Sequence, residues 1–289
     1  MFLWEGVSEF VAVAEAESFT AAAKQLGIST AQVSRQISAL ENRLNTKLFY
    51  RTTRKVSLTE EGAIYYQHCR RLMDGLEEAE RAISDRRDTP QGSLKLTAPV
   101  TYGEQYIMPL VVDFMQQYPE VDVTMNLTNQ TVDLVEGGYD LAIRLGKLSS
   151  STMMAKRLAN RTQYVCASSV YLEKYGVPHS LSELRHHNCL VGNYDHWRFQ
   201  EAGKERSVKV DGTLRCASGH ALRDAALKGL GLVQLPDYYI SDDLDKGELV
   251  TVLDTFREPE EGIWALYPHN RHLSPKVRLL VDFLADSLS

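Results

Sequence analysis

The chain has 289 residues, of which 44% are hydrophobic and 24% charged, which predicts two or three folded domains with ordinary cores and excludes a disordered chain. Its net charge of −6, taken alone, disfavours a nucleic-acid-binding protein. That total conceals a basic segment, because residues 20–58 hold seven Lys and Arg and one acid, Glu41, for a local net charge of +6. The residues after Asp88 carry a net −5, so their surface is expected to repel DNA.

Signals for catalysis, metal binding and export are missing. The four cysteines form no CxxC pair, and no P-loop, dinucleotide-binding, nucleophile-elbow or zinc-protease motif is present. The closest approach to a metal cluster, residues 186–189, lacks a second ligand pair at zinc spacing. No signal peptide is recognisable, and no apolar stretch approaches the ~20 residues that span a bilayer. We therefore expect a soluble, cytoplasmic protein that is not an enzyme, without cofactor, metal or membrane partner.

The first 45 residues predict three helices. Val7, Phe10 and Val11 recur at helical spacing, so a first helix is expected over residues 6–16. Ser18 is a good N-cap for a helix over residues 19–26 that Gly27 ends. Ser29 and Gln32 then form a capping box for a third helix with apolar positions at Val33, Ile37, Leu40 and Leu44.

Two short helices joined by a glycine turn are typical of a helix-turn-helix, whose second helix enters the DNA major groove. The outward residues at the start of that helix can all hydrogen-bond to base edges; they are Thr30, Gln32, Ser34, Arg35 and Gln36. The alternative is an ordinary solvated helix face. The lack of acids before Glu41 and the surrounding cations favour DNA.

The basic stretch after Leu48 and Phe49 predicts a wing. Val56 and Leu58 alternate with polar residues, as in a short strand pair. Its cations are expected to contact phosphates, with the wing tip near the minor groove; they are Arg51, Arg54 and Lys55.

Thr59, followed by Glu60 and Glu61, is expected to cap a long helix. Six residues on it form a heptad-spaced stripe: Tyr65, Cys69, Leu72, Leu76, Ala79 and Ile83. Either the stripe packs on its own chain, or it is a dimerisation surface that joins two DNA-binding heads. Residues 89–92 are expected to form a hinge.

The rest of the chain alternates strands and helices, which predicts an α/β sheet with helices on both faces. Strands are expected over residues 94–98, 121–125 and 141–143, and helices over 104–118 and 131–136. A second such unit spans about residues 163–263, with a strand over 164–167, a helix over 221–228 and a strand over 231–236. A closing helix over residues 275–287 is expected to return to the first lobe.

These motifs together resemble the LysR-type transcriptional regulators. The resemblance rests on residues 19–23, Leu26, Ser29, residues 33–37, 40–41, 48–54 and 58–62, in order, and the total length and downstream pattern extend it to the whole chain. The chain departs from the family at Thr30-Ala31, where Gln-Pro is common, and at Asn45, where Gly is usual. Asn tolerates a left-handed backbone, so that turn is expected to survive.

The resemblance implies an architecture and a function. It implies an α+β winged helix-turn-helix over residues 1–58, a linker and dimerisation helix over 59–88, and a two-lobed α/β domain like periplasmic binding proteins over 93–289. Lobe I would span about residues 93–162 and 264–289, and lobe II about 163–263. A homodimer or tetramer would bind a pseudo-palindromic promoter site and activate or repress transcription under a small-molecule co-inducer. RNA polymerase is a further possible partner.

Ligands of doubly wound sheets bind beyond the carboxyl ends of the strands. The candidate effector-binding residues follow from this position and from the family's two lobes; they are Val100, Thr101, Tyr102, Thr128, Asn129, Arg144, Gly146, His196, Trp197, Gly219 and His220. Thr101 can instead be only a helix cap, Arg144 can pair with Asp140, and Trp197 can be a packing residue. We hypothesise a small effector that is anionic or an aromatic acid.

Three other classes of function stay open. A metabolite-binding protein without DNA activity is disfavoured by the basic segment, and an enzyme by the missing catalytic motifs. A redox or metal sensor would use Cys166, Cys189 or Cys216.

Overall fold

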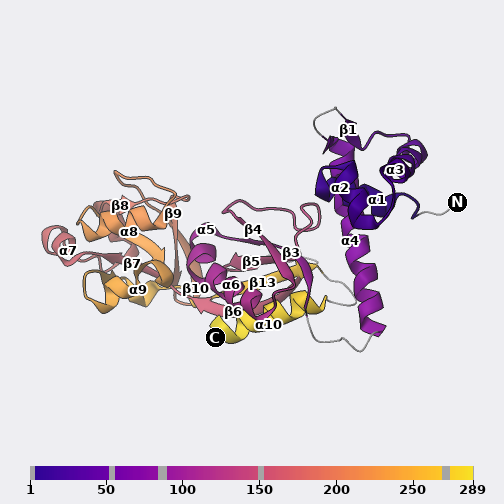
Figure 1. The fold of residues 1–289 in the computed structure, drawn as a ribbon. Coiled ribbons are helices and arrows are strands. Elements are labelled where there is room, and N and C mark those ends of the chain that lie inside the picture. The colour runs from indigo at the N-terminus through magenta and orange to yellow at the C-terminus, as the bar shows by residue number, and fades with distance from the viewer. Residues whose placement is uncertain (1–3, 52–55, 84–89, 149–152, 269–273, 289) are drawn as a thin grey trace. The chain divides into compact units, whose positions relative to one another are not determined.

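A computed structural model describes residues 4–51, 56–83, 90–148, 153–268 and 274–288. The chain forms two compact units, Met1–Thr89 and Pro90–Ser289 (Figure 1). Among the described residues, no helix combines the length and the apolarity needed to cross a membrane.

The N-terminal unit is a three-helix head with a two-stranded wing and a long helix. Its elements are α1 (Val7–Ala16), α2 (Phe19–Leu26), α3 (Thr30–Leu44), β1 (Phe49–Arg51), β2 (Val56–Leu58) and α4 (Glu60–Ile83). The predicted helix-turn-helix and strand pair are thus confirmed.

Local side-chain chemistry sets the helix ends as predicted. Ser18 Oγ accepts a hydrogen bond from the backbone N of Ala21, at 3.3 Å, and opens α2. Ser29 Oγ accepts from the backbone N of Gln32, at 3.2 Å, and opens α3. Gly27 ends α2 with φ 67°, and Asn45 ends α3 with φ 51°, so the asparagine does adopt the left-handed turn that glycine usually provides.

One apolar core joins all parts of the head. Phe10 of α1 meets the ring of Phe49 at 5.3 Å and that of Tyr65 on α4 at 5.4 Å between centroids. Gly62 lets the first turn of α4 approach the wing closely, because any side chain there would overlap the carbonyl oxygen of Leu48. The base of α4 is therefore part of the head.

Lobe I of the C-terminal unit is built on a five-stranded sheet of order β4-β3-β5-β13-β6. Its elements are β3 (Gly92–Ala98), α5 (Val100–Tyr102), η1 (Gly103–Ile107), α6 (Met108–Gln117), β4 (Val121–Leu127), β5 (Leu141–Leu145), β6 (Met153–Arg161), β13 (Glu261–Pro268) and α10 (Pro275–Leu288). Strand β3 is parallel to β4 and β5, whereas β13 is antiparallel to β5 and β6. The closing helix returns to lobe I as predicted.

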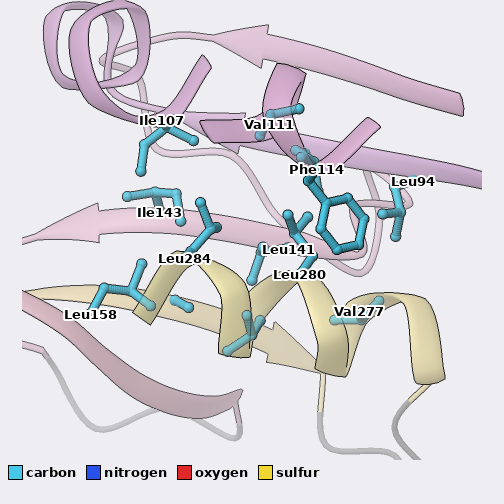
Figure 2. Close-up of a cluster of buried hydrophobic side chains, with 14 of the residues drawn as sticks. Leu94, Ile107, Val111, Phe114, Leu141, Ile143, Leu158, Val277, Leu280 and Leu284 are labelled. Carbon is cyan, nitrogen blue, oxygen red and sulfur yellow. The ribbon is translucent and has the colours of Figure 1, made fainter. Parts of the chain in front are cut away.

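Helices α6 and α10 share one apolar core on the sheet of lobe I. Figure 2 shows Phe114 of α6 and Leu280 of α10 meeting Leu94 and Leu141 of the sheet. The prediction of a helix over residues 131–136 was wrong. Asp133 Oδ1 accepts from the backbone N of Val135 and of Glu136, both at 2.8 Å, and Gly137 and Gly138 follow, so only a turn forms.

Lobe II has a four-stranded sheet of order β12-β7-β11-β8 and a separate hairpin, β10-β9. Its strands are β7 (Gln163–Ala167), β8 (Cys189–Leu190), β9 (His196–Glu201), β10 (Lys204–Lys209), β11 (Leu232–Pro236) and β12 (Val250–Val252). Its helices are α7 (Ser169–Tyr175), η2 (Leu181–His186), α8 (Gly219–Leu227), α9 (Asp237–Asp245) and η3 (Asp254–Phe256). One face of the sheet packs on α8 and α9, and the other on α7 and the hairpin, so here helices cover both faces as predicted.

Candidate functional site

The outer face of α3 is polar and accessible. Thr30, Gln32 and Arg35 are exposed, and Ser34 and Gln36 are partly exposed. On the inner face, Val33 and Ile37 are fully buried. The five predicted DNA-contacting residues of α3 thus all have access to solvent.

The one acid of the basic segment does not reach this surface. The Glu41 side chain is only 1% exposed, and its Oε2 pairs with Lys47 Nζ at 2.8 Å. Its Oε1 accepts from the backbone N of Leu48 at 3.0 Å and of Phe49 at 3.4 Å. The sequence held a signal for this that we missed, because residues 33, 37 and 41 fall on one helix face at spacings of four.

The wing is described only at its base. Strand β1 pairs with β2 in the register Phe49↔Leu58 and Arg51↔Val56. Arg54 and Lys55 lie outside the described residues, and so does the side chain of Arg51. Their expected phosphate contacts stay a prediction.

The stripe on α4 divides into two parts. Cys69 is buried in the head core, so the expectation that it contacts a second chain is corrected, whereas Tyr65 packs on Phe10 but is partly exposed, and its expected contact stays a prediction. Beyond the head the same stripe is open, with Leu72 59% and Leu76 50% exposed. The side chains of Ala79 and Ile83 lie outside the described part of the chain.

The carboxyl ends of β3 and β4 bring part of the predicted effector set together. The backbone N of Thr128 donates to the carbonyl O of Ala98 at 2.9 Å. The backbone N of Val100, at the start of α5, donates to Asn129 Oδ1 at 3.1 Å. Thr101 is partly exposed beside them.

Arg144 lies near the carboxyl end of β5, the strand beside β3. Its Nη1 donates to the carbonyl O of Ile143 at 2.9 Å, whereas Nη2 is buried without a hydrogen-bond partner. Burial lowers the pKa of this guanidinium, which Tyr139 partly offsets. The alternative in which Asp140 pairs with Arg144 is not observed among the described residues; Asp140 Oδ2 accepts from the backbone N of Lys95 at 2.7 Å.

Tyr102 does not offer its ring to a ligand. It is buried, stacked on Tyr106 at 4.8 Å and edge-on to Tyr238 of lobe II at 5.3 Å between centroids. Burial, followed by the nearby Tyr106 and Asp237, raises its pKa. Its expected effector contact is corrected to an aromatic contact between the lobes.

The lobe II residues of the predicted set separate into two groups. His220 Nε2 lies 3.2 Å from Gln105 Nε2 of lobe I, so His220 is at the lobe junction. Gly219 is required beside it, because a side chain there would overlap the ring of Tyr239. Trp197 is buried in the lobe II core, as its packing alternative predicted, and His196 pairs with Asp195 at 2.7 Å.

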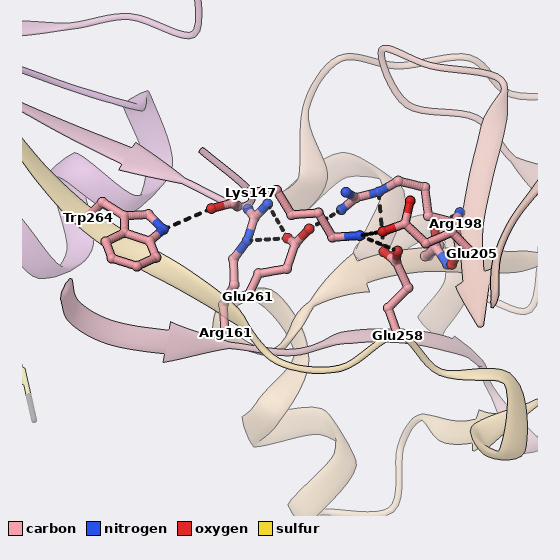
Figure 3. Close-up of polar contacts among 9 residues, drawn as sticks. Lys147, Arg161, Arg198, Glu205, Glu258, Glu261 and Trp264 are labelled. Carbon is pink, nitrogen blue, oxygen red and sulfur yellow. Dashed lines mark hydrogen bonds and ion pairs between the residues drawn. The ribbon is translucent and has the colours of Figure 1, made fainter. Parts of the chain in front are cut away.

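An ion cluster at the lobe junction was missed by sequence reasoning (Figure 3). Its anions, Glu258 and Glu261, are buried. The cations come from both lobes, since Lys147 Nζ meets Glu258 at 3.0 Å and Arg198 Nη2 of the hairpin meets Glu261 at 2.7 Å. Arg161 also pairs with Glu261, at 2.7 Å. No local pattern marks such a cluster, because its members are up to about a hundred residues apart in the chain.

Gly146 belongs to this junction. It has φ 98°, its N donates to Gly262, and its carbonyl O accepts from Trp264 Nε1 at 2.9 Å. It lines a cavity of about 340 Å³ whose other walls include Lys147, Glu258 and Trp264. Its backbone therefore holds β13 beside β5, and its expected effector contact stays a prediction.

Two of the three candidate sensor cysteines, Cys166 and Cys189, are buried. Among the described residues, no group of three or more His, Cys, Asp or Glu could hold a metal ion. Burial, and to a lesser extent a nearby aspartate, raises the pKa of Cys166 and of Cys189 to about 12, so both thiols stay protonated near neutral pH. This disfavours these two cysteines as redox sensors.

Comparisons with known proteins agree with this arrangement. The family model for the bacterial regulatory helix-turn-helix protein, lysR family, matches residues 5–63, and that for the LysR substrate binding domain matches residues 87–289. An HTH-type transcriptional regulator of Xanthomonas campestris is 38% identical over 288 residues, covering 97% of this chain and 84% of that protein.

Two solved structures are similar over nearly the full length. CrgA of Neisseria meningitidis, a LysR-type transcriptional regulator, has a TM-score of 0.60 at 31% identity and covers 97% of each chain. The virulence activator AphB of Vibrio cholerae has a TM-score of 0.59 at 29% identity and covers 99% of each chain.

Proposed function

This chain belongs to the LysR family of bacterial helix-turn-helix regulators, and on that basis we propose how it reads DNA and what it senses. It is a DNA-binding transcriptional regulator with a C-terminal substrate-binding domain, in a family of regulators and not of enzymes. The residues that contact DNA, the effector and the assembly are proposals.

We propose that α3 reads base edges in the major groove while the wing cations contact phosphates. The observation that carries this is the acid-free outer face of α3, whose one nearby acid, Glu41, is buried. The guanidinium of Arg35 can donate two hydrogen bonds to guanine O6 and N7, and the amides of Gln32 and Gln36 can form two hydrogen bonds with adenine N6 and N7. Arg51, Arg54 and Lys55 add affinity without sequence preference.

Genome-wide mapping of bound sites, followed by gel shifts on a mapped site, tests this proposal. Arg35→Ala is expected to cost about 1–3 kcal/mol on that site and far less on unrelated DNA. Arg206→Ala is the matched control, because Arg206 is an exposed cation on the β9–β10 hairpin of the C-terminal unit. Equal losses for Arg35→Ala on both DNAs would refute base readout by this residue.

For the effector, we propose a small carboxylate that binds at the carboxyl ends of β3, β4 and β5. The supporting observation is Arg144, a partly buried guanidinium whose Nη2 has no hydrogen-bond partner. A buried charge without a partner is costly, and a carboxylate would both neutralise it and accept its hydrogen bonds. Val100, Thr101, Thr128 and Asn129 supply further polar groups, and His220 lies at the lobe junction.

A thermal-shift screen of the full chain against small aliphatic and aromatic carboxylic acids tests the effector class. A ligand is expected to raise the melting temperature of the wild type, and Arg144→Met is expected to abolish that shift. Arg215→Met serves as the control, because Arg215 is an exposed arginine of lobe II. Stabilisation by acids that survives Arg144→Met, or none by any acid in the screen, contradicts the proposal.

We further propose a homodimer, or a tetramer made of two such dimers, that joins two heads through the exposed part of α4. Two heads would engage the two halves of a pseudo-palindromic site. Whether the complex activates or represses, and contacts RNA polymerase, depends on where the site lies relative to the promoter, which the mapping experiment measures.

A further inference from the structure

The wing leaves the head through a short segment, residues 47–49, which we call the wing root. Two side chains from different helices hold its backbone. Glu41 of α3 accepts from the backbone N of Leu48 and of Phe49, at 3.0 and 3.4 Å. Thr59, the residue that caps α4, donates from Oγ1 to the carbonyl O of Lys47 at 2.7 Å, and from its backbone N to the carbonyl O of Leu48 at 3.0 Å.

The carboxylate of Glu41 is expensive to bury. Its side chain is 1% exposed, whereas Lys47, one of its partners, is 73% exposed, so this ion pair is poor compensation for the burial. The neighbouring positions on the inner face of α3 hold the apolar residues Val33 and Ile37, and an apolar residue would also suit the burial at position 41. An apolar residue could not accept the two hydrogen bonds from the backbone N–H groups of the wing root, and Glu41 does.

We propose that Glu41 is a positioning residue for DNA binding, which fixes the direction of the wing relative to the recognition helix. The wing root is held by α3 on one side and by the start of α4 on the other, and Arg51 follows it within two residues. Turning the root would move the cations of the wing away from the phosphates. This inference rests on the proposed phosphate contacts of the wing.

Simple electrostatics makes the opposite prediction. Glu41→Gln removes a negative charge from the head and frees the Lys47 ammonium, so without any positioning effect DNA affinity should rise. If Glu41 positions the wing, affinity should fall although the head has become more positive. The sign of the change separates the two explanations.

The experiment measures binding of the full-length chain to a mixed-sequence duplex over a range of salt concentrations. Each phosphate contact contributes about −0.9 to the slope of log K against log salt. Loss of the three wing contacts should therefore make the slope shallower by about 2–3 per head for Glu41→Gln, with affinity about tenfold or more weaker near 0.1 M salt. Glu41→Asp, which keeps the charge but is one methylene shorter, should show the same change if position is what matters.

Two controls make the result decisive. Val13→Ala removes buried volume from α1 and destabilises the head but leaves the hydrogen-bonding groups of Glu41 and Thr59 in place, so its slope should equal that of the wild type. Arg54→Gln tests the wing contact itself and should make the slope shallower by about one per head. Binding is measured only at temperatures where each variant retains its helical circular dichroism.

The outcomes are distinct. A shallower slope for Glu41→Gln and Glu41→Asp, but not for Val13→Ala, supports the inference. An unchanged or steeper slope for both Glu41 variants, while Arg54→Gln makes it shallower, overturns the inference and leaves the wing contacts intact. An unchanged slope for Arg54→Gln refutes the proposed role of the wing instead.

Discussion

Arg144, the arginine proposed to bind the effector, is expected to reduce the stability of the fold. Its guanidinium is partly buried, and Nη2 makes no hydrogen bond. Leaving such a group unpaired costs about 1–3 kcal/mol. In the apo protein the arginine therefore works against folding, and a ligand would relieve that cost.

Arg144→Met is accordingly expected to stabilise the apo chain, by about 1 kcal/mol, since it keeps an unbranched stem and removes the unpaired charge. Urea denaturation of the C-terminal unit, followed by circular dichroism, measures the change. Arg215→Met, at an exposed position, should leave the unfolding free energy within about 0.5 kcal/mol of the wild type. A clear loss of stability in Arg144→Met would mean that the guanidinium is satisfied in the folded apo chain.

Residues whose role is local were predictable from the sequence, and residues whose role depends on burial were not. Ser18, Ser29 and Asn45 act on their own helix ends, where residue type decides the outcome. Tyrosine and tryptophan occur both in ligand sites and in hydrophobic cores, so residue type alone does not decide the role of Tyr102 or Trp197. Only packing against distant parts of the chain decides between these roles.

At the scale of elements, ion pairs between side chains hold the β9–β10 hairpin on lobe I. Lys147 of lobe I pairs with both Glu205 of β10 and Glu258, and Arg198 of β9 pairs with Glu261 (Figure 3). Lys147 follows Arg144 by three residues, at the end of the same strand. The proposed effector arginine is thus close in the chain to a contact between the lobes.

Glu205→Gln should loosen the hairpin without unfolding lobe II. The Lys147–Glu205 pair is largely exposed and therefore weak, so amide hydrogen exchange in β9 and β10 should accelerate by only about two- to fivefold. Glu201→Gln is the matched control, since Glu201 pairs with Arg206 within the same hairpin, at 3.1 Å. Equal exchange in the two variants would mean that the Lys147 contact does not restrain the hairpin.

Glu261 should make the stability of the C-terminal unit depend on pH in the acid range. Burial acts to raise the pKa of this carboxyl, but the guanidinium groups of Arg161 and Arg198 outweigh it, so the pKa lies below its ordinary value of 4.5. The ionised carboxylate therefore stabilises the fold above that value, and this contribution is lost as the pH falls through the lowered pKa.

Glu261→Gln is expected to cost about 3 kcal/mol at pH 7, because it removes the negative charge that Arg161 and Arg198 share and turns an amide NH2 donor toward one of the two guanidinium groups. The difference from wild type should shrink below about pH 4, as the wild-type carboxyl also loses its charge. Urea denaturation between pH 3 and 7 measures both. A difference that stays constant over this range would exclude the ionised pair as its source.

The types of many elements were predictable from the sequence, but which elements pack on each face of a sheet was not. Hydrophobic period predicted β3, β4, β5, β7, β11 and the closing helix, because a half-buried strand or helix shows its period locally, but it did not predict β6, β13 or the β9–β10 hairpin. The turn at residues 134–138 replaced an expected helix, since Asp133 and the two glycines that follow favour a turn. The ion cluster between the lobes had no local signature at all.

At the scale of the whole molecule, the apolar stripe on α4 has a part that packs into the head and a part that is exposed. Its first part, Tyr65 and Cys69, packs into the head, and its second part, Leu72 and Leu76, is exposed. The base of the helix is also tied to α1, because Arg70 pairs with Glu15 at 3.4 Å. A dimer formed through the second part would therefore hold each head firmly at the end of its own helix.

Leu72→Glu combined with Leu76→Glu is expected to separate that dimer, because it places four like charges in an apolar seam. Sedimentation of the full-length chain should shift toward the monomer, and affinity for a mapped two-half site should fall about 10²–10⁴-fold as the linkage between heads is lost. Ile64→Glu is the control, because Ile64 is equally exposed, at 57%, on the same helix but off the stripe. Affinity for a single half-site should stay unchanged in the double variant, since its head core is untouched. A double variant that sediments like the wild type would locate the dimer contact elsewhere, in the C-terminal units.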